Sequence, residues 1–373
     1  MKLAIVHDDL IQEGGAEKVV EAMLEIWPQA DVFTSMASRR WLSKFERVQT
    51  SFMQNLPFKE KLYRHYLAFY PLAFESFDFS NYDVVISSSA RFAHGVITSP
   101  RTLHVCYIHS VPRMWWGSSS YFAGGWLQSL FSPLASYLRI WDWTAAQRVD
   151  CFVANSKHTA TRVKKFYRRE AEVIYPFVDL ERFQLAPTAR TKRNGVPPRR
   201  GGAGSYFLVV SRLVRWKRID LVIEACLRVG ASLKIIGEGP DMARLKKLAA
   251  HSTVEFLGRL SDADVISYMG GARALLFPQC EDLGMALLEA LATGTPVLAF
   301  KGGGALETMI PGETGDFFYP QTAEALAREL TSFKLRRYDP SSCRRRAHQF
   351  SKVSFLRKFE SFVAAQYATL RAN

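Results

Sequence analysis

Short apolar runs alternate with amphipathic segments through the second half of the chain, and this alternation limits the fold more than any other feature. Each run is about as long as a strand, and the segments between them have apolar residues at helical spacing. Strands that alternate with helices form a parallel sheet with right-handed crossover connections. The expected strands are 206–210, 232–236, 254–257, 274–278 and 296–300, and the expected helices between them include 220–228, 242–250 and 263–269.

The first half of the chain begins with a similar pattern. A short strand, residues 2–6, leads through a polar loop into Gly14, Gly15 and an amphipathic helix, which is typical of a Rossmann-like unit. GxGxxG is absent, so a dinucleotide fingerprint is not supported. Two adjacent glycines still allow a phosphate or a sugar to come close, although a plain strand-to-helix turn explains them equally well. Further strands are expected at 31–34, 83–87, 101–108, 150–156 and 172–176.

The length and one irregular segment predict how these patterns divide. The chain has 373 residues, which is too long for one core and enough for two domains. Residues 186–205 are rich in Pro, Gly and Arg and lack periodicity, so they read as a linker. We therefore expect an α/β protein with domains at 1–185 and 206–350, followed by a C-terminal helix within 351–373.

Composition narrows the partners without choosing one. The formal net charge is +14, with 49 Lys and Arg against 35 Asp and Glu, which favours nucleic acid, anionic lipid or phosphorylated substrates. The five cysteines form no CxxC pair, so neither a disulfide framework nor a zinc site is predicted, and a reducing cytosol is expected. No run approaches eighteen apolar residues and the first residues do not resemble a signal peptide, so neither a membrane-spanning segment nor a leader is expected.

The strand at 274–278 is followed by a turn and a helix that carry two acidic residues. Glu281 lies in the turn and Glu289 lies eight residues later, about 12 Å away at helical rise. Gly284 in the turn permits close approach of a ligand, and the helix start with Met285 and Ala286 offers unpaired N–H groups to a phosphate. Two carboxylates at this separation can accept hydroxyl protons at opposite ends of a nucleotide sugar. Two solvated helix acids are the alternative.

A basic loop follows the first strand of the same half. Arg212 and Lys217 in the string SRLVRWKR are close enough in sequence to face one anion, Arg as a fork and Lys as a point charge. A solvated basic loop is the alternative reading.

These strings resemble the family 4 retaining glycosyltransferases. The resemblance rests on the spacing of Glu281 and Glu289, on the strings GTPVLA and GGGALET that follow, on PGETGDF, and on GGAE near the start. It implies the GT-B fold, in which two Rossmann-like domains face each other across a cleft and the last helix crosses back to the first domain. It also implies that Arg212 and Lys217 hold the diphosphate of the donor. Glu281 would then hold its sugar and Glu289 its ribose. Gly14, Gly15, Gly284, Met285 and Ala286 would complete the donor site, with Arg259 beside the base.

A histidine string in the first half resembles a narrower group. His109 follows an expected strand, and HSVPRMWW is similar to the H-[ST]-P-x-R-x-x-W pattern of family 4 mannosyltransferases that build surface polysaccharides. The resemblance places His109 against the donor sugar near the reacting carbon and Arg113 towards the acceptor. The string departs at Val111, where proline is usual, and at Gly117, where an acid is usual. On local sequence alone, a hydrogen-bonded turn histidine is as good a reading.

Residues 39–79 mix aromatic and basic side chains. Lys59, Lys61 and Arg64 are interleaved with rings, which suits the interface of an anionic membrane. The same mixture suits single-stranded nucleic acid, and core helices with solvated Lys faces explain it as well. In the resembled family this region faces the acceptor, so membrane contact is the preferred functional reading.

The resulting hypothesis is a retaining hexosyltransferase that uses a nucleoside diphosphate sugar, with GDP-mannose as the expected donor. The expected acceptor is a glycan, including one linked to polyprenyl diphosphate, on the cytoplasmic face of the inner membrane. Neither a metal nor a cofactor is expected, because fixed cations replace the metal on the leaving diphosphate. The alternatives are a nucleotide-sugar epimerase of the same fold and a basic nucleic-acid-binding protein, although the motifs give no reason to expect nucleic acid as a partner.

Overall fold

The chain forms two compact units. The computed structural model describes residues 1–117, 126–184, 206–250, 252–334 and 337–372, so the predicted linker 186–205 lies outside the described residues. Unit 1 comprises Met1–Pro176 with Lys352–Asn373, and unit 2 comprises Phe177–Ser351. The boundary falls before the expected one at residue 185, because Val178 pairs with Ser351 and helix α8 (Leu180–Gln184) contacts a helix of unit 2.

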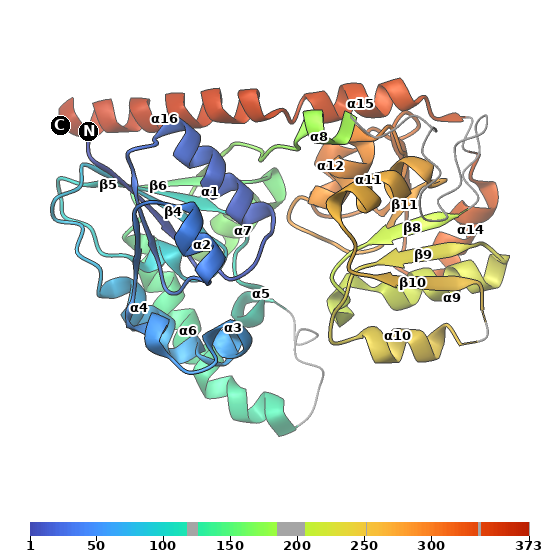
Figure 1. Ribbon diagram of the computed structural model, residues 1–373, viewed down its shortest axis with the longest axis horizontal. Helices are drawn as coiled ribbons and strands as arrows, with labels where there is room; N and C mark the ends of the chain where they lie inside the picture. Colours follow the sequence, from blue (N-terminus) through green and yellow to red (C-terminus); the bar gives the residue numbers. More distant parts are fainter. Residues whose placement is uncertain (118–125, 185–205, 251, 335–336, 373) are drawn as a thin grey trace. The chain divides into compact units, whose positions relative to one another are not determined.

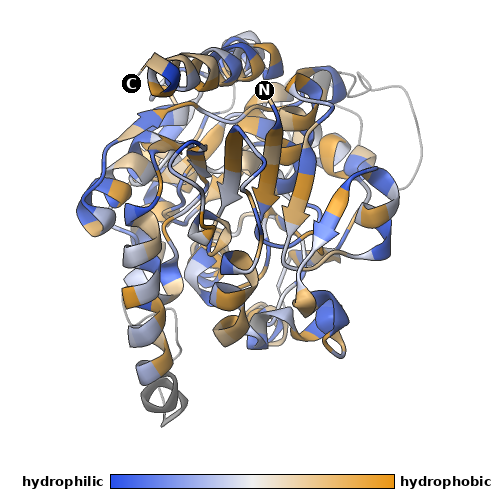
Figure 2. Ribbon diagram, turned by 90° about the vertical axis from the view of Figure 1, so that its left-hand side faces the viewer, coloured by the Kyte–Doolittle hydropathy of each residue, from blue (hydrophilic) through white to orange (hydrophobic). Residues whose placement is uncertain are grey.

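Unit 1 is built on a seven-stranded parallel sheet (Figure 1). Its order is β3-β2-β1-β4-β5-β6-β7, so the chain reverses its direction of strand addition between β1 and β4. Every residue of β4 and β5 is buried, as expected for a parallel sheet covered on both faces. Figure 2 shows hydrophobic strands in the interior, surrounded by helices that contain both hydrophilic and hydrophobic residues. The strands are β1 (Leu3–His7), β2 (Asp31–Thr34), β3 (Val48–Thr50), β4 (Val84–Ser89), β5 (Leu103–Ile108), β6 (Cys151–Ala154) and β7 (Ala171–Val173).

The helices of unit 1 cover this sheet, and the last helix of the chain belongs to this unit. Phe355 and Phe359 of α16 pack edge-on against Tyr107 of β5, with ring centroids 5.8 and 5.7 Å from it. The helices are α1 (Gly15–Ile26), α2 (Arg39–Lys44), α3 (Lys59–Leu62), α4 (Tyr70–Glu75), α5 (Arg113–Trp116), α6 (Trp126–Gln147), α7 (Lys157–Tyr167) and α16 (Lys352–Ala372). In the part of the chain that the structure describes, no helix is long and apolar enough to cross a membrane.

The aromatic segment 39–79 divides between core and surface. Trp41, Tyr63, Tyr70, Phe74 and Phe79 are buried. The core-helix alternative therefore accounts for about half of the rings in this segment. Of the others, Phe45, Tyr66 and Phe77 are half-buried, and Phe52, Phe58 and Phe69 are exposed.

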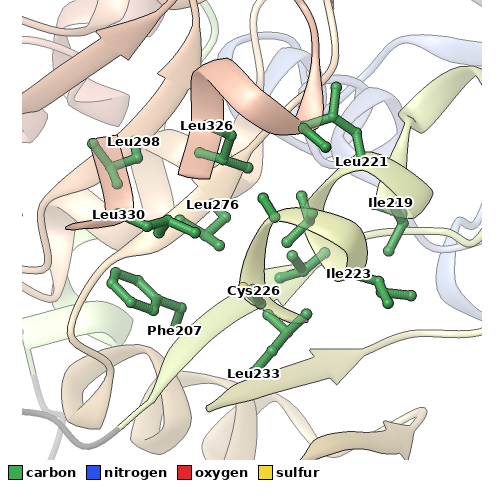
Figure 3. Close-up of a cluster of buried hydrophobic side chains, with 14 of the residues drawn as sticks. Phe207, Ile219, Leu221, Ile223, Cys226, Leu233, Leu276, Leu298, Leu326 and Leu330 are labelled. Carbon is green, nitrogen blue, oxygen red and sulfur yellow. The ribbon is translucent and has the colours of Figure 1, made fainter. Parts of the chain in front are cut away.

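Unit 2 repeats the arrangement with six parallel strands in the order β10-β9-β8-β11-β12-β13. The core lies between this sheet and helices that include α9 and α14, and Figure 3 shows Phe207, Leu276 and Leu298 of the sheet close to Leu326 and Leu330 of α14. The predicted α/β class with two parallel sheets is confirmed. The strands are β8 (Phe207–Val210), β9 (Leu233–Ile236), β10 (Val254–Gly258), β11 (Leu275–Phe277), β12 (Val297–Phe300) and β13 (Gly315–Phe318). The remaining helices are α9 (Ile219–Val229), α10 (Met242–Leu248), α11 (Asp262–Gly271), α12 (Met285–Ala292), α13 (Ala305–Thr308), α14 (Ala323–Ser332) and α15 (Pro340–His348).

Candidate functional site

Two predicted site residues meet at the switch point of the unit 2 sheet. The strand order reverses between β8 and β11, and open α/β sheets bind ligands beyond the carboxyl ends of the strands at such a point. Lys217 follows β8, Glu281 follows β11, and the ammonium of Lys217 forms an ion pair with Oε1 of Glu281. Their side chains are 15% and 16% exposed, so this pair of charges is largely screened from water but still reachable.

Glycines hold the backbone of Glu281 in place. Gly304 donates its N–H to the Glu281 carbonyl at 2.9 Å, and a Cβ at Gly303 would lie 2.3 Å from the same oxygen. Gly303 has φ +64°, a conformation that glycine adopts without strain. The string that resembled the family therefore has a physical function, because it lets the loop after β12 pack directly on the backbone of Glu281.

A second glycine turn supports the basic loop. Leu213 donates its N–H to the Glu238 carbonyl at 2.9 Å, and Asp241 donates its N–H to the Leu213 carbonyl at 3.0 Å. A Cβ at Gly237 would lie 1.9 Å from the Ser211 carbonyl oxygen. The turn after β9 thus fixes the loop that carries Lys217. Sequence reasoning missed this role, although the string GEGPD after a strand was a visible signal.

The other predicted donor residues of unit 2 lie at the same edge of the sheet or on α12. Gly284, with φ +94°, is the residue before α12, and Met285 and Ala286 form its first turn. Glu289 is half-buried one turn later. Arg212 and Arg259 are exposed, on the loops that follow β8 and β10.

The switch point of unit 1 carries a buried polar cluster that the sequence showed only as a polar loop. Asp8 accepts hydrogen bonds from the N–H groups of Ala90, Phe92 and Ala93 at 2.7–2.8 Å. Burial alone would raise the pKa of Asp8, but Arg91, His7 and these N–H groups outweigh it and lower the pKa.

Asp9 and Arg91 form the second half of this cluster. The Arg91 guanidinium makes an ion pair with Asp9, which is 3% exposed. Burial raises the pKa of Asp9, the charge of Asp8 adds to this, and Arg91 opposes it. The Tyr70 hydroxyl lies 3.5 Å from the same carboxylate. Unit 1 therefore places two carboxylates, Asp8 and Asp9, and the cation of Arg91 at the carboxyl edge of its sheet, where open α/β sheets bind ligands.

His109 lies directly after β5 at this edge. Its Nε2 is 2.8 Å from the Ser88 hydroxyl, and its carbonyl accepts a hydrogen bond from the Asn155 amide at 2.8 Å. Burial, with the positive charge of His7, lowers the pKa of His109 to about 4. The side chain is therefore neutral at physiological pH.

Two arginines and one aspartate hold the loop that follows His109. Arg162 donates to the Val111 carbonyl at 2.7 Å and Arg139 donates to the Trp115 carbonyl at 2.8 Å. The Trp116 indole donates to Asp142 at 2.5 Å. Arg113, a predicted acceptor residue, lies within this loop and is half-buried.

Gly14 and Gly15 are exposed at the start of α1, where the Gly14 N–H donates to Glu17 at 2.9 Å. Of the predicted membrane residues, Lys61 is exposed and Lys59 donates to the Gln54 carbonyl at 2.8 Å, while the Arg64 side chain lies outside the described part. Among the residues that the structure describes, no three His, Cys, Asp or Glu side chains are grouped so that they could hold a metal ion.

Buried His104 predicts a dependence of stability on pH. Burial, with the charges of His94 and Arg148, lowers its pKa from 6.5 to about 3. The unfolded chain binds this proton below pH 6.5 while the folded chain does not, so the free energy of unfolding decreases as the pH is lowered from 7 to 5. His104→Gln should reduce the loss between pH 7 and pH 5 by about 2 kcal/mol in urea titrations.

The exposed His65 supplies the control for this measurement, and His65→Gln should leave the slope unchanged. The pKa of His7 is raised, so His7 stabilises the fold at low pH and opposes the effect of His104 on stability. This contribution is the same in the wild type and in His104→Gln, so it cancels in the comparison. Equal slopes for His104→Gln and the wild type would contradict the prediction.

Solved structures resemble the whole chain. The crystal structure of Alr3699/HepE from Anabaena in complex with UDP has a TM-score of 0.73 at 19% identity, with 98% of this chain and 100% of that one covered. Sucrose-phosphate synthase from Thermosynechococcus elongatus has a TM-score of 0.74 at 18% identity, with 99% and 100% covered. At these identities the likeness shows the fold, which is GT-B as predicted.

Curated relatives match part of the chain. A "GDP-mannose-dependent alpha-(1-6)-phosphatidylinositol monomannoside mannosyltransferase" of Mycobacterium tuberculosis is 31% identical over 179 residues, covering 43% of this chain and 46% of the relative. A "D-rhamnosyltransferase WbpZ" of Pseudomonas aeruginosa is 30% identical over 215 residues, covering 55% and 53%. The matched stretches thus span about half the length of these relatives.

Two family models match the chain in succession. The model "Glycosyltransferase Family 4" matches residues 13–182, and the model "Glycosyl transferases group 1" matches residues 198–350. Between them the models take in Arg91 and His109 of unit 1 and the Lys217–Glu281 pair of unit 2, whereas Asp8 and Asp9 precede the first match. The chain therefore belongs to the family 4 glycosyltransferases of the GT-B fold.

Proposed function

We propose that this protein transfers a hexose, most simply mannose from GDP-mannose, to a glycan or lipid-linked glycan, with retention of the anomeric configuration. The observation that carries the proposal is the Lys217–Glu281 pair at the switch point of unit 2, beside the glycine-led start of α12. Relatives named as GDP-mannose-dependent mannosyltransferases support the choice of donor.

Unit 2 would bind the donor by exchanging ion pairs. A diphosphate brought to Lys217 replaces the Glu281 carboxylate as its partner, with Arg212 and the N–H groups at the start of α12 as further donors. The freed Glu281 can then accept a hydroxyl proton of the hexose, and Glu289 can accept from the ribose. In this way binding of the phosphate would prepare the contact that recognises the sugar.

The same cations would lower the barrier of transfer. Negative charge grows on the diphosphate as the bond to the sugar carbon breaks, and fixed donors stabilise that charge without having to reorient. An oxygen of the leaving phosphate can take the proton of the attacking hydroxyl on the same face of the sugar, which retains the configuration. His109 of unit 1 would hydrogen-bond a hydroxyl of the sugar substrate.

The test is a transfer assay with a panel of nucleotide sugars and polyprenyl-diphosphate-linked acceptors. Release of nucleoside diphosphate should need both substrates, and NMR of the product should show the anomeric configuration of the donor. Adding a chelator should leave the rate unchanged. Conversion of the donor without any acceptor would instead indicate the epimerase alternative, and an inverted product would refute retention.

A surface of unit 1 fits an anionic membrane, which is the second part of the proposal. Phe58 is 73% exposed and Leu72 is 61% exposed, with exposed Phe52, Phe69 and Lys61 in the same segment. Phe58 also has φ +49°, a left-handed conformation that costs a bulky residue about 1–2 kcal/mol and that here leaves most of the ring exposed. Rings beside Lys suit the headgroup region on the cytoplasmic face of the inner membrane.

Changing Phe58 and Leu72 together to Ser should weaken binding to phosphatidylglycerol vesicles by at least about 100-fold, because each inserted side chain contributes about 1.5–3 kcal/mol. Vesicle sedimentation measures this. The control changes Leu227 and Leu306 of unit 2, which are 43% and 51% exposed, to Ser. Equal vesicle binding by both double variants would contradict this surface.

A further inference from the structure

A chain of side-chain contacts, one ion pair followed by two hydrogen bonds, connects Glu17 of α1 in unit 1 to His109. Oε1 of Glu17 lies 4.0 Å from Nε2 of His7, and Nδ1 of His7 lies 3.1 Å from the Ser88 hydroxyl. The same hydroxyl lies 2.8 Å from Nε2 of His109. The four residues come from α1, β1, β4 and the loop that begins directly after β5. His7, Glu17 and Ser88 are buried, so water does not readily replace a lost partner of these side chains, and breaking one of their contacts costs free energy.

The backbone fixes the direction of these hydrogen bonds. Nδ1 of His7 also lies 3.0 Å from the carbonyl oxygen of Ser88, and a carbonyl can only accept, so Nδ1 of His7 carries a proton. That N–H is shared with the Ser88 hydroxyl, which therefore accepts from His7. The single hydroxyl proton of Ser88 is then directed at His109, and Nε2 of His109 must accept it.

We propose that Ser88, His7 and Glu17 are positioning residues that hold His109 as the neutral tautomer with its proton on Nδ1. In this form His109 donates a hydrogen bond from Nδ1 and has no free lone pair, so it binds an oxygen of the sugar substrate and does not act as a base. The inference rests on the proposed function for its substrate, but the tautomer itself does not.

The charges around the chain agree with this assignment. His7 faces Glu17 of α1 and Asp8 and Asp9 of its own segment, and these carboxylates outweigh burial and raise its pKa. The raised pKa favours the cationic form of His7, in which Nε2 also carries a proton and faces Glu17. The charged groups around His109 are His7, Asp8 and Glu17. Its ring packs against that of Tyr107 of β5 in an edge-to-face arrangement, with the ring centroids 5.1 Å apart. Its low pKa means that it should stay neutral from pH 8 to pH 5.

The experiment is nitrogen-15 NMR of the full chain with labelled histidine. The His109 signals, assigned by their loss in His109→Gln, should show a protonated Nδ1 and an unprotonated Nε2, unchanged from pH 8 to pH 5. Ser88→Ala should abolish this preference, and Ser88→Thr should restore it. In a transfer assay Ser88→Ala should lower kcat about tenfold, the cost of one hydrogen bond, with little change in KM for the donor.

The neighbouring serine provides the matched control. Ser87 on the same strand makes the same kind of contact, 2.8 Å from its hydroxyl to Nε2 of buried His104. Ser87→Ala should leave the His109 signals unchanged. A protonated Nε2 in wild-type His109, or a Ser88→Ala variant that keeps the wild-type tautomer, would overturn the inference. The NMR result is independent of activity, so it would stand even if the protein proved not to be a transferase.

Discussion

Lys217→Ala is expected to lower kcat/KM for transfer by about 100- to 1000-fold while the protein stays folded. One fixed donor to growing negative charge is worth about 2.7–4 kcal/mol in comparable sites, which gives this range. Removing Lys217 also leaves Glu281 without its ion-pair partner and with a carboxylate facing the incoming diphosphate. Steady-state kinetics with the donor varied measures the loss.

A second ion pair of unit 2 serves as the control for Lys217. Lys234 pairs with Glu255 at 2.5 Å between β9 and β10, within the strands and not beyond their carboxyl ends. Lys234→Ala should keep the wild-type kcat/KM and a similar melting temperature. If Lys217→Ala also kept the wild-type rate, Lys217 would have no part in stabilising the leaving group.

Gly303→Ala is expected to weaken donor binding at least tenfold. The added Cβ would lie 2.3 Å from the Glu281 carbonyl oxygen, which is backbone and cannot turn aside like a side chain. The loop after β12 must then move away from Glu281, and the carboxylate moves with its backbone. Calorimetric titration of the nucleotide sugar measures the effect.

Gly230→Ala is the control that distinguishes displacement of the loop from the strain of the left-handed backbone alone. Gly230 has the same φ of +64° at the end of α9, and a Cβ there would meet nothing within 4 Å. Both alanine variants should lose about 1 kcal/mol of stability from the left-handed conformation. Gly230→Ala should keep the donor affinity of the wild type, and equal losses of affinity in the two variants would show that packing against Glu281 is not the cause.

The sequence was sufficient to predict the sheet type and the segments that carry the unit 2 site. Strand and helix periodicity is local, and the turn with Glu281 follows its strand by only a few residues, so one-dimensional spacing was enough to place it. The proximity of Lys217 and Glu281 is different in kind. It depends on β8 and β11 being neighbours in the sheet although 64 residues separate these two side chains.

The polar cluster of unit 1 could not be predicted for the same reason. Asp8 and Arg91 lie in loops far apart in sequence, and only the pairing of β1 with β4 brings them together. His7 and Ser88 were equally invisible, because a lone histidine and one serine in a run of three have no distinctive spacing. The division of the aromatic segment between core and surface could not be predicted for another reason, since periodicity over such short helices does not distinguish the buried Phe74 from the exposed Phe58.

Direct titration of nucleotide sugars into the wild-type protein and three variants tests the central claim, namely that the carboxyl edge of the unit 2 sheet grips an activated sugar. Calorimetry should show saturable binding of GDP-mannose to the wild type and to Lys234→Ala. Affinity should fall at least tenfold in Lys217→Ala and in Glu289→Gln. Equal affinity in all four proteins, or no binding of any nucleotide sugar to the wild type, would contradict it.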